Sequence, residues 1–363
     1  MFIWCNYNAI LITVNAVKPG IFDISKDDFD LVNSKLKLDI LRLKNCKILL
    51  TGGTGFFGKW ILGSLLNLNR SFKLNLSISV LSRNPINFFK KFPNLKKYKE
   101  LSFIKGNIIN FSTNQKDFTH IIHGATDATI ESHLNIKYLS ENIVKGTQNI
   151  LDFASKNKIN NFLFISSGSV YGKQMVKNSL KINEKHGKYL DSNDLGNASG
   201  ILKKSAELLC NYWASECSTR KIKIARCFAF VGPWLPINSH FAIGNFINSS
   251  ILNNNIIINS DGASLRSYLY TSDLVIWLLK ILILDDRYLT INVGSDQKFS
   301  IKEIAILVKK VTQKKIKIII QKKDKSKSTA YVPDIRLAKS KGLKIYTPLE
   351  KSILKTYNFY KEH

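Results

Sequence analysis

Thr51-Gly52-Gly53-Thr54-Gly55-Phe56-Phe57-Gly58 is the stretch of this 363-residue chain that decides its fold. The glycines follow the pattern G-x-x-G-x-x-G, with a short apolar run before them at 47–50 and apolar residues at helical spacing after them at 60–68. Glycine permits a tight turn and a close approach of the backbone to a pyrophosphate, and the first N–H groups of the helix face the phosphates. The pattern therefore predicts the phosphate loop of a dinucleotide-binding domain.

The strand–turn–helix pattern around this loop is repeated along the chain. Helices are predicted at 139–156 and 199–214, between short apolar runs that are typical of strands. The predicted strands are 47–50, 76–81, 101–104, 120–123, 161–166 and 223–227. Strands that alternate with helices form a parallel sheet with helices on both faces. The predicted fold class is therefore α/β, a Rossmann-type doubly wound parallel sheet with a smaller C-terminal substrate-binding lobe.

Three regions follow from this pattern. Residues 1–45 are an N-terminal extension with helical spacing at 21–45, and residues 46–232 form the NAD(P)-binding domain. Residues 233–363 form mainly the substrate-binding lobe, with helices expected at 272–284 and 300–311. The lobe is expected over the carboxyl edge of the sheet, where ligands bind in such folds.

The first 17 residues are apolar. They lack the basic start and the cleavage site of a signal peptide, asparagines interrupt them, and they are too short to span a bilayer. We expect a buried extension and no membrane span, with a weak contact to a membrane or a partner as the alternative.

The net charge is the unusual feature of the composition. Lys and Arg number 54 against 26 Asp and Glu, which gives a formal net charge of +28. The lysines are spread along a chain that is also rich in Asn and Ile, so compositional drift and solubility explain the excess better than nucleic-acid binding. Five cysteines without a Cys-x-x-Cys pair indicate reduced thiols, a cytoplasmic location and no metal site.

Eight residues in the loop and at the end of the second strand are expected to contact the cofactor: Gly52, Thr54, Gly55, Phe56, Phe57, Gly58, Ser82 and Arg83. An NAD enzyme usually carries Asp or Glu after the second strand for the ribose 2′-hydroxyl, whereas Arg suits the 2′-phosphate of NADP. This position has no acid, which favours NADP over NAD. A surface position and stacking on adenine are the alternatives for Arg83.

Further motifs follow the loop in a fixed order. They are HGAT at 123–126, NIVKGTQN at 142–149, SSGSVYG at 166–172, KKSAE at 203–207, RCFAFVGP at 226–233, SDG at 260–262, RSYLYTSD at 266–273 and INVGSD at 291–296. In this order, from about residue 45 to about residue 357, the chain resembles the extended short-chain dehydrogenases/reductases of the NAD-dependent epimerase/dehydratase family. The enzymes of this family act on nucleotide sugars.

The resemblance implies NAD or NADP as the cofactor and a nucleotide-diphosphate sugar as the substrate. Further cofactor contacts are implied at Asn107, Ile108, Gly124, Ala125, Thr126, Asn142 and Lys203, and substrate contacts at Ser167, Tyr171 and Arg266. A guanidinium suits a diphosphate, and an ion pair of Arg266 with Asp273 or Asp261 is the alternative. Family members are often homodimers through the helices at 139–156 and 199–214, and we expect a homodimer.

The resemblance also assigns catalytic residues. In the family, a Tyr takes the proton of a sugar hydroxyl, a Lys four residues later lowers the pKa of that Tyr, and a Ser or Thr hydrogen-bonds the sugar oxygen. These positions correspond to Ser199, Lys203 and Ser167, so the expected Tyr is replaced by Ser199. A serine hydroxyl cannot supply a phenolate-like base near neutral pH, and loss of a general base typically costs roughly 10²–10⁴-fold in rate.

Three interpretations of this replacement stay open. The protein is a weakly active or non-catalytic nucleotide-binding relative, or another tyrosine such as Tyr189 or Tyr171 serves, or Ser199 and Lys203 hold a water that acts as the base. Simpler roles are also open, since Lys203 can pair with Glu207 on the surface and Ser199 can be an N-cap or first-turn residue. A strand-end hydroxyl that only satisfies local backbone is the simpler role for Ser167.

The residues after Ser167 narrow the range of reactions that we expect. Family dehydratases carry an acidic residue just after the Ser or Thr, and decarboxylases tend to carry Glu one position later, where this chain has Gly168-Ser169. We therefore expect an epimerase or a carbonyl reductase that acts through transient sugar oxidation.

Overall fold

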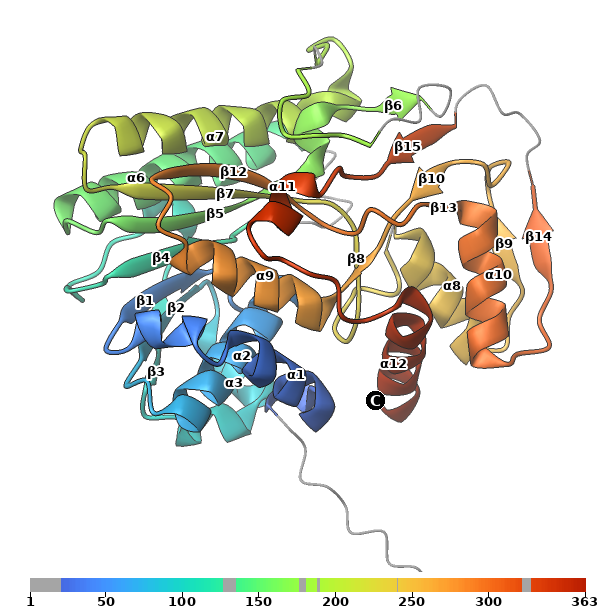
Figure 1. The fold of residues 1–363 in the computed structure, drawn as a ribbon, viewed down its shortest axis with the longest axis horizontal. Coiled ribbons are helices and arrows are strands. Elements are labelled where there is room, and N and C mark those ends of the chain that lie inside the picture. The colour runs from blue at the N-terminus through green and yellow to red at the C-terminus, as the bar shows by residue number, and fades with distance from the viewer. Residues whose placement is uncertain (1–20, 127–134, 176–180, 188–189, 240, 322–327) are drawn as a thin grey trace, which may run out of the picture.

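The computed structural model describes residues 21–126, 135–175, 181–187, 190–239, 241–321 and 328–363 (Figure 1). The apolar segment at 1–17 and Tyr189 lie outside the described residues. Among the described residues, no helix is both long and apolar enough to cross a membrane.

The core of the molecule is a seven-stranded sheet in the order β12-β7-β5-β4-β1-β2-β3, with every neighbouring pair parallel. The strands are β1 Lys47–Thr51, β2 Ser77–Ser82, β3 Leu101–Lys105, β4 His120–His123, β5 Asn161–Ser167, β7 Lys221–Cys227 and β12 Tyr288–Val293. The prediction of an α/β, doubly wound parallel sheet is confirmed, and β12 is the strand that the sequence did not reveal. The chain runs outward from β1 to β3 and then crosses to β4, so β1 and β4 border the switch point where such sheets bind ligands.

Helices cover both faces of the sheet (Figure 1). On one face, α2 Phe56–Phe72 and α9 Thr271–Ile283 lie beside α1 Lys26–Leu36. On the other face lie α6 Gly146–Lys156 and α7 Ala198–Ser215, together with α5 Ile136–Ser140. A single π-helical turn at Glu141–Lys145 joins α5 to α6, so the helix predicted at 139–156 is interrupted. Such turns occur often at functional sites.

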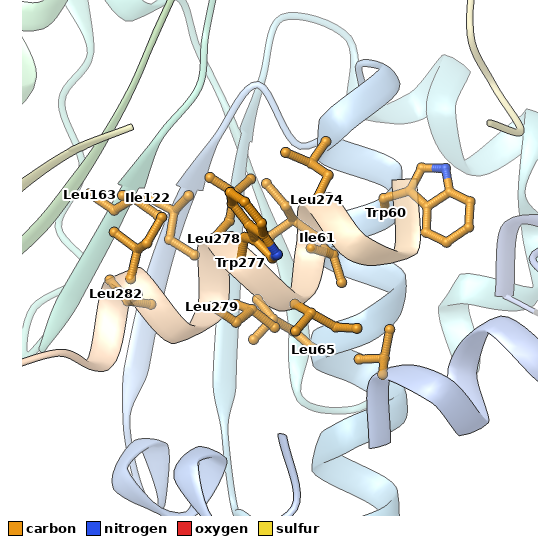
Figure 2. Packing of buried hydrophobic residues seen from close by; sticks show 14 of the residues in the cluster. Trp60, Ile61, Leu65, Ile122, Leu163, Leu274, Trp277, Leu278, Leu279 and Leu282 are labelled. Carbon is orange, nitrogen blue, oxygen red and sulfur yellow. The ribbon is translucent and has the colours of Figure 1, made fainter. Parts of the chain in front are cut away.

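The larger apolar core lies between α2, α9 and the sheet (Figure 2). Trp277 and Leu278 of α9 lie beside Ile61 of α2, and Leu282 of α9 lies beside Leu163 of β5; each of these side chains is at most 1% exposed. Burial of a large apolar side chain contributes about 1.5–3 kcal/mol, so this layer holds α9 firmly on the sheet. Although α9 follows residue 233, it therefore belongs to the dinucleotide-binding layers, as does β12.

The remaining C-terminal elements form a second lobe with its own apolar core. It contains α8 Ala242–Ile251, α10 Ile301–Thr312, α12 Leu349–Glu362 and the parallel pair β9 Ile256–Ile258 and β14 Ile318–Ile320. The helices predicted at 272–284 and 300–311 correspond to α9 and α10, whereas α12 was not predicted.

Short strands connect the two parts. A four-stranded sheet in the order β13-β10-β15-β6 contains β13 Phe299–Ser300, β10 Leu265–Arg266, β15 Thr329–Tyr331 and β6 Gln174–Met175. A two-stranded sheet joins β8 Phe230–Val231 to β11 Leu269–Tyr270. Two short helices, α3 Pro85–Lys91 and α11 Arg336–Ser340, complete the described part of the fold.

Candidate active site

The glycine loop turns sharply between β1 and α2. Gly52 has a φ of +75°, and a Cβ atom added there would lie 2.5 Å from the carbonyl oxygen of Gly124. A Cβ atom on Gly58 would lie 2.1 Å from the carbonyl oxygen of Gly52. Both positions therefore require glycine, because any side chain would collide with backbone that cannot move aside.

The start of α2 is suited to a phosphate. Its N-cap is Gly55, and no side chain among the described residues caps the first N–H groups of the helix. Uncapped N–H groups at a helix N-terminus bind anions. Phe56 and Phe57 begin the helix, and the ring of Phe57 lies 4.9 Å from that of Phe230, which anchors the turn to β8. The carbonyl of Thr54 accepts a hydrogen bond from Lys59 Nζ at 3.0 Å.

The loop is fastened to the end of β4 by Thr51. Its Oγ1 accepts hydrogen bonds from the N–H groups of Gly124 and Ala125, each at 3.2 Å, and lies 2.7 Å from Nδ1 of His123. Burial, with a smaller effect from the charge of Lys203, lowers the pKa of His123 to about 3. His123 is therefore a neutral residue that holds the loop and not an acid or base.

The other predicted cofactor residues lie at the carboxyl ends of β2 and β3. Ser82 Oγ accepts a hydrogen bond from the N–H of Asn84, and Arg83 donates to the hydroxyl of Tyr138 at 3.0 Å. Asn107 caps the short helical turn that begins with Ile108, through a bond from the N–H of Ile109.

Asn142 and Ile108 meet on the side of the π-helical turn. The Asn142 carboxamide donates to the carbonyl of Tyr138 at 2.8 Å, and Ile108 packs against Gly146, where an added Cβ atom would lie 2.9 Å from it. Asn142 and Ile108 therefore fix the backbone beside the carboxyl edge of the sheet, Asn142 through its hydrogen bond and Ile108 through packing.

Lys203 lies one turn into α7 and points to the end of β5. Its Nζ donates to Thr126 Oγ1 at 2.7 Å and to the carbonyl of Ile165 at 3.0 Å, and the residue is 5% exposed. Burial lowers the pKa of Lys203 to about 8 against the opposing effects of Cys227, Cys210 and Glu207.

A surface pair between Lys203 and Glu207 is excluded. Glu207 is buried, accepts a hydrogen bond from Ser166 Oγ at 2.6 Å and forms an ion pair with Arg226 at 2.6 Å. No carboxylate of the described residues lies within 4 Å of the Lys203 ammonium group.

Ser167 ends β5 and begins a short helical turn, Gly168–Tyr171. Its Oγ accepts a hydrogen bond from the N–H of Ser169 at 3.1 Å and interacts with the hydroxyl of Tyr331, which β15 brings from the C-terminal part of the chain. Gly168 makes room for this phenol, because a Cβ atom there would lie 2.6 Å from the Tyr331 oxygen. Burial raises the pKa of Tyr331, so its hydroxyl stays protonated.

Ser199 is the second residue of α7 and lies half-buried in its first turn. The next residue, Gly200, packs directly on the turn after β5, since a Cβ atom there would lie 2.3 Å from the carbonyl oxygen of Ser169. The first turn of α7 is thereby brought against the segment that carries Ser167.

Tyr171 is not available as a substitute base. It is 1% exposed, its hydroxyl donates to Asn292 Oδ1 at 2.8 Å, and it accepts from Arg226 at 2.9 Å. Burial raises its pKa to about 12 despite the nearby Arg226 charge. Burial and these bonds give Tyr171 a place in the core and do not favour the predicted substrate contact or a role as substitute base.

Arg266 lies on β10, opposite Tyr331 of β15 in the strand register. Its guanidinium donates to the carbonyls of Leu265 and Thr329, at 2.8 and 3.1 Å, and to the Thr329 hydroxyl at 3.2 Å. Burial lowers its pKa.

The alternative of an ion pair between Arg266 and an aspartate is excluded. Asp273 accepts bonds from the N–H groups of Tyr346 and Thr347, and Asp261 is bonded to Ser328. Among the described residues, no carboxylate lies within 4 Å of Arg266, so this half-buried cation lacks a counter-charge.

The family model described as NAD dependent epimerase/dehydratase family matches residues 48–294, which run from the strand before the glycine loop to the end of β12. The chain belongs to this family. With the order of motifs from the glycine loop to β12, it is an extended short-chain dehydrogenase/reductase.

Several named proteins are similar to this chain. A putative UDP-glucose 4-epimerase of Methanocaldococcus jannaschii is 25% identical over 318 residues, which are 87% of this chain and 99% of the relative. The UDP-N-acetylglucosamine 4-epimerase of Methanobrevibacter ruminantium, solved with UDP-N-acetylmuramic acid, has a TM-score of 0.75 at 19% identity and covers 88% of this chain and 99% of its own. The UDP-glucuronic acid 4-epimerase of Bacillus cereus, solved with NAD, has a TM-score of 0.71 at 21% identity, with 87% and 99% coverage.

Tyr331 is the site residue that the sequence did not reveal. It stands outside every motif of the epimerase/dehydratase family quoted above. It lies beside Ser167 because β15 pairs with β6, the strand that follows the Ser167 turn, while its other edge pairs with β10. The sequence carried one signal of this contact, the glycine at 168, because the absence of a side chain there leaves space beside Ser167 for another residue.

Proposed function

We propose that this chain binds NAD and a nucleoside-diphosphate sugar and carries out oxidoreduction at a sugar carbon, as an epimerase or a carbonyl reductase. The observation that carries the proposal is a pair of cations, Lys203 at the end of β5 and Arg266 on β10, that have no carboxylate partner among the described residues. The ammonium group of Lys203 donates to the carbonyl of Ile165 in β5. Arg266 lies opposite Tyr331 in the strand register, and the Tyr331 hydroxyl interacts with Ser167. A cation in a protein interior is costly unless an anion pairs with it, and an anionic ligand would supply the missing charge.

The glycine loop fits a dinucleotide, because its backbone leaves a space that a Cβ atom would fill and α2 begins with free N–H groups. The backbone from Gly52 to Gly58 would hold the pyrophosphate, and the rim at Ser82, Asn107 and Ala125 would face the adenosine half. When bound, NAD supplies the hydride acceptor and donor. We propose NAD over NADP because a similar structure is solved with NAD and because Arg83 is engaged with Tyr138.

The residues of this chain divide the remaining work. Arg266 would pair with the diphosphate of the sugar nucleotide, and Ser167 would hydrogen-bond the oxygen of the reacting carbon. Lys203 would bind the nicotinamide ribose and supply positive charge next to that oxygen. With Ser199 in the place of the usual tyrosine, the base would be a water held by Ser199 and Lys203, and Tyr331 would donate a hydrogen bond to Ser167.

A second candidate function is nucleotide-sugar binding without turnover. Ser199 favours it, since no phenol stands at the usual position and Tyr171 is turned into the core. The substitution Ser199→Tyr separates the two functions. It raises turnover, by roughly 10²-fold or more, if the chain is an enzyme that lacks only its base, and it leaves turnover absent if the chain is a binding protein.

The direct test is to purify the protein, identify any dinucleotide that remains bound, and titrate NAD and NADP by calorimetry. UDP-, GDP-, CDP- and dTDP-sugars are then screened by thermal shift and by product analysis. We expect NAD binding and stabilisation by at least one nucleotide sugar. Failure to bind either dinucleotide would refute the proposal, whereas binding without any product would select the second candidate.

We also propose a homodimer through α7. Leu208 and Tyr212 on this helix are 69% and 63% exposed, and their positions four residues apart put them on one face. Light scattering should give twice the mass of the chain, and Leu208→Lys should give the mass of the monomer. A monomeric wild-type protein at micromolar concentration would exclude this interface.

A further inference from the structure

The strands β9 and β14 form the outer edge of the C-terminal lobe, with β14 outermost (Figure 1). Their side chains alternate between the two faces, as strand geometry requires. Ile256 and Ile258 point inward and are at most 2% exposed, whereas Ile257 and its register partner Ile319 point outward and are 49% and 41% exposed. Two large aliphatic side chains therefore lie side by side in solvent.

A hollow of about 490 Å³ lies next to this pair. Its walls come from α8, β9 and β14. Phe246, Ile257 and Ile319 form its apolar part, and Phe246 is 4% exposed, whereas the polar part comes from Asn245, Ser249, Asn254 and Asn255. Among the described residues, no titratable side chain lines it. We call the outward face of β9 and β14, with this hollow, the isoleucine face.

Lysines lie beside the isoleucine face, in the segment that leads into β14. Lys317 precedes Ile319 by two residues and so points to the same side of the strand, and Lys315 is also exposed. Lys314 is bonded through Nζ to Asn253 Oδ1, at the border of the hollow. In the described part of the chain, no carboxylate lies within 4 Å of any of these three lysines. Lys309 and Lys310 in the last turn of α10 add positive charge that also stabilises that helix end.

We infer that the isoleucine face docks on an anionic membrane surface. Exposed aliphatic side chains with lysines beside them suit the interface of a bilayer that contains acidic lipids, where the apolar groups enter between headgroups and the ammonium groups contact phosphates. The inference is independent of the proposed nucleotide-sugar function.

Charge complementarity selects this occupant over two others. A second copy of the chain would bring lysine against lysine, which repels. A nucleic acid would be contacted by exposed aromatic side chains that stack on bases and by arginines. The described part of the isoleucine face exposes isoleucine, asparagine and lysine instead, and its aromatic residue, Phe246, is 4% exposed. Acidic lipid is the anionic partner that also accommodates the isoleucines.

The test is sedimentation of the full-length protein with vesicles. Phosphatidylcholine mixed with phosphatidylglycerol should bind the protein, and phosphatidylcholine alone should bind it much more weakly. The double variant Lys317→Gln/Ile319→Ser removes one charge and one aliphatic group, and it should lower the partition coefficient by about 10-fold or more, of which about fivefold comes from the lysine.

A matched control makes the same chemical change on α3 and the turn after it, far from the isoleucine face. Ile86 is 66% exposed and Lys96 is exposed, so Lys96→Gln/Ile86→Ser has the same composition and net charge as the test variant. It should bind vesicles within about twofold of wild type. Thermal unfolding of all three proteins checks that the exposed substitutions leave the fold intact.

Three results would overturn the inference. The first is a wild-type protein that fails to bind phosphatidylglycerol vesicles at low salt, and the second is an equal loss of binding in the α3 control. The third is a variant that binds vesicles normally but loses RNA binding or loses self-association in sedimentation velocity, which would assign the isoleucine face to that partner instead.

Discussion

The glycine loop after β1 and the segment that joins β5 to α7 lie at the same edge of the sheet, but they are built in different ways. The loop depends on backbone geometry, since Gly52 and Gly58 leave no room for a Cβ atom and α2 presents free N–H groups. In the proposed function the second segment depends on single side chains, namely Ser167 and Lys203, with Ser199 in the place of the usual tyrosine. Binding and chemistry are therefore separable in this molecule, and one can be lost while the other is kept.

The largest expected effect tests the side-chain part of this comparison. Lys203→Met should lower turnover by roughly 10²–10⁴-fold, because it removes the charge beside Ile165 and Thr126. NAD affinity should fall much less, since the glycine loop is untouched. Steady-state kinetics and calorimetry on the same preparation measure both.

Lys203→Met also has a predicted pH signature. Burial depresses the pKa of Lys203 to about 8, so between pH 8 and its unfolded value of 10.5 the unfolded chain binds more protons than the folded chain. The wild type should gain up to about 3 kcal/mol of unfolding free energy over this window, and the variant should lack that gain. Parallel slopes of urea-derived stability against pH in the two proteins would contradict the position given to this lysine.

The backbone part of the comparison is tested at Gly58. Gly58→Ala would bring a Cβ atom to within 2.1 Å of the Gly52 carbonyl oxygen, and relief of that clash must shift the loop. We expect NAD affinity to fall by about 10²-fold, or about 3 kcal/mol, as in strained overpacking. Gly187→Ala is the control, because Gly187 lies outside the loop and its Cβ atom would lie 4.0 Å from the Lys185 carbonyl oxygen, an ordinary contact distance. Equal losses in both variants would show that steric fit does not decide binding.

The sequence revealed the fold far better than the site. Six strands were found because each is a short run rich in apolar residues within the alternation of strands and helices, whereas β12, in which Thr290 and Asn292 interrupt the apolar residues, was missed. The positions of Ser167, Ser199 and Lys203 were identified from motifs, since these residues are close along the chain.

Contacts between distant segments could not be read in this way. Tyr171 lies inside a motif, but its bonds to Asn292 and Arg226 show that it belongs to the core. Tyr331 is far along the chain from Ser167, and the pairing of β15 with β6, which follows the Ser167 turn, brings the two together. Which tyrosine faces the site is decided by tertiary packing and not by any local pattern.

A smaller effect concerns the fastening of the loop to β4. Burial depresses the pKa of His123 to about 3, below its unfolded value of 6.5, so its contribution to stability is present above pH 6.5 and is lost as the pH falls. Between pH 7 and pH 4.5 this residue alone should cost about 2–3 kcal/mol of unfolding free energy. His123→Asn should remove this part of the loss of unfolding free energy in acid. The loss that remains in the variant should include the contribution of His120, whose pKa burial lowers to about 4. Urea unfolding of both proteins across this range would reject the assignment if their acid sensitivities were equal.

The smallest expected effect is at Tyr331, which β15 brings from the C-terminal part of the chain to Ser167. Tyr331→Phe keeps the ring against Phe228, at a centroid distance of 4.7 Å, and removes only the hydroxyl beside Ser167. A neutral hydrogen bond is typically worth about 0.5–1.5 kcal/mol, so turnover should fall by up to about tenfold while KM and NAD affinity stay near their wild-type values. Ser167→Ala should cause the larger loss, and the double variant should be no worse than Ser167→Ala alone, because Tyr331 acts through the Ser167 hydroxyl. An additive double variant would show instead that Tyr331 contacts the sugar directly.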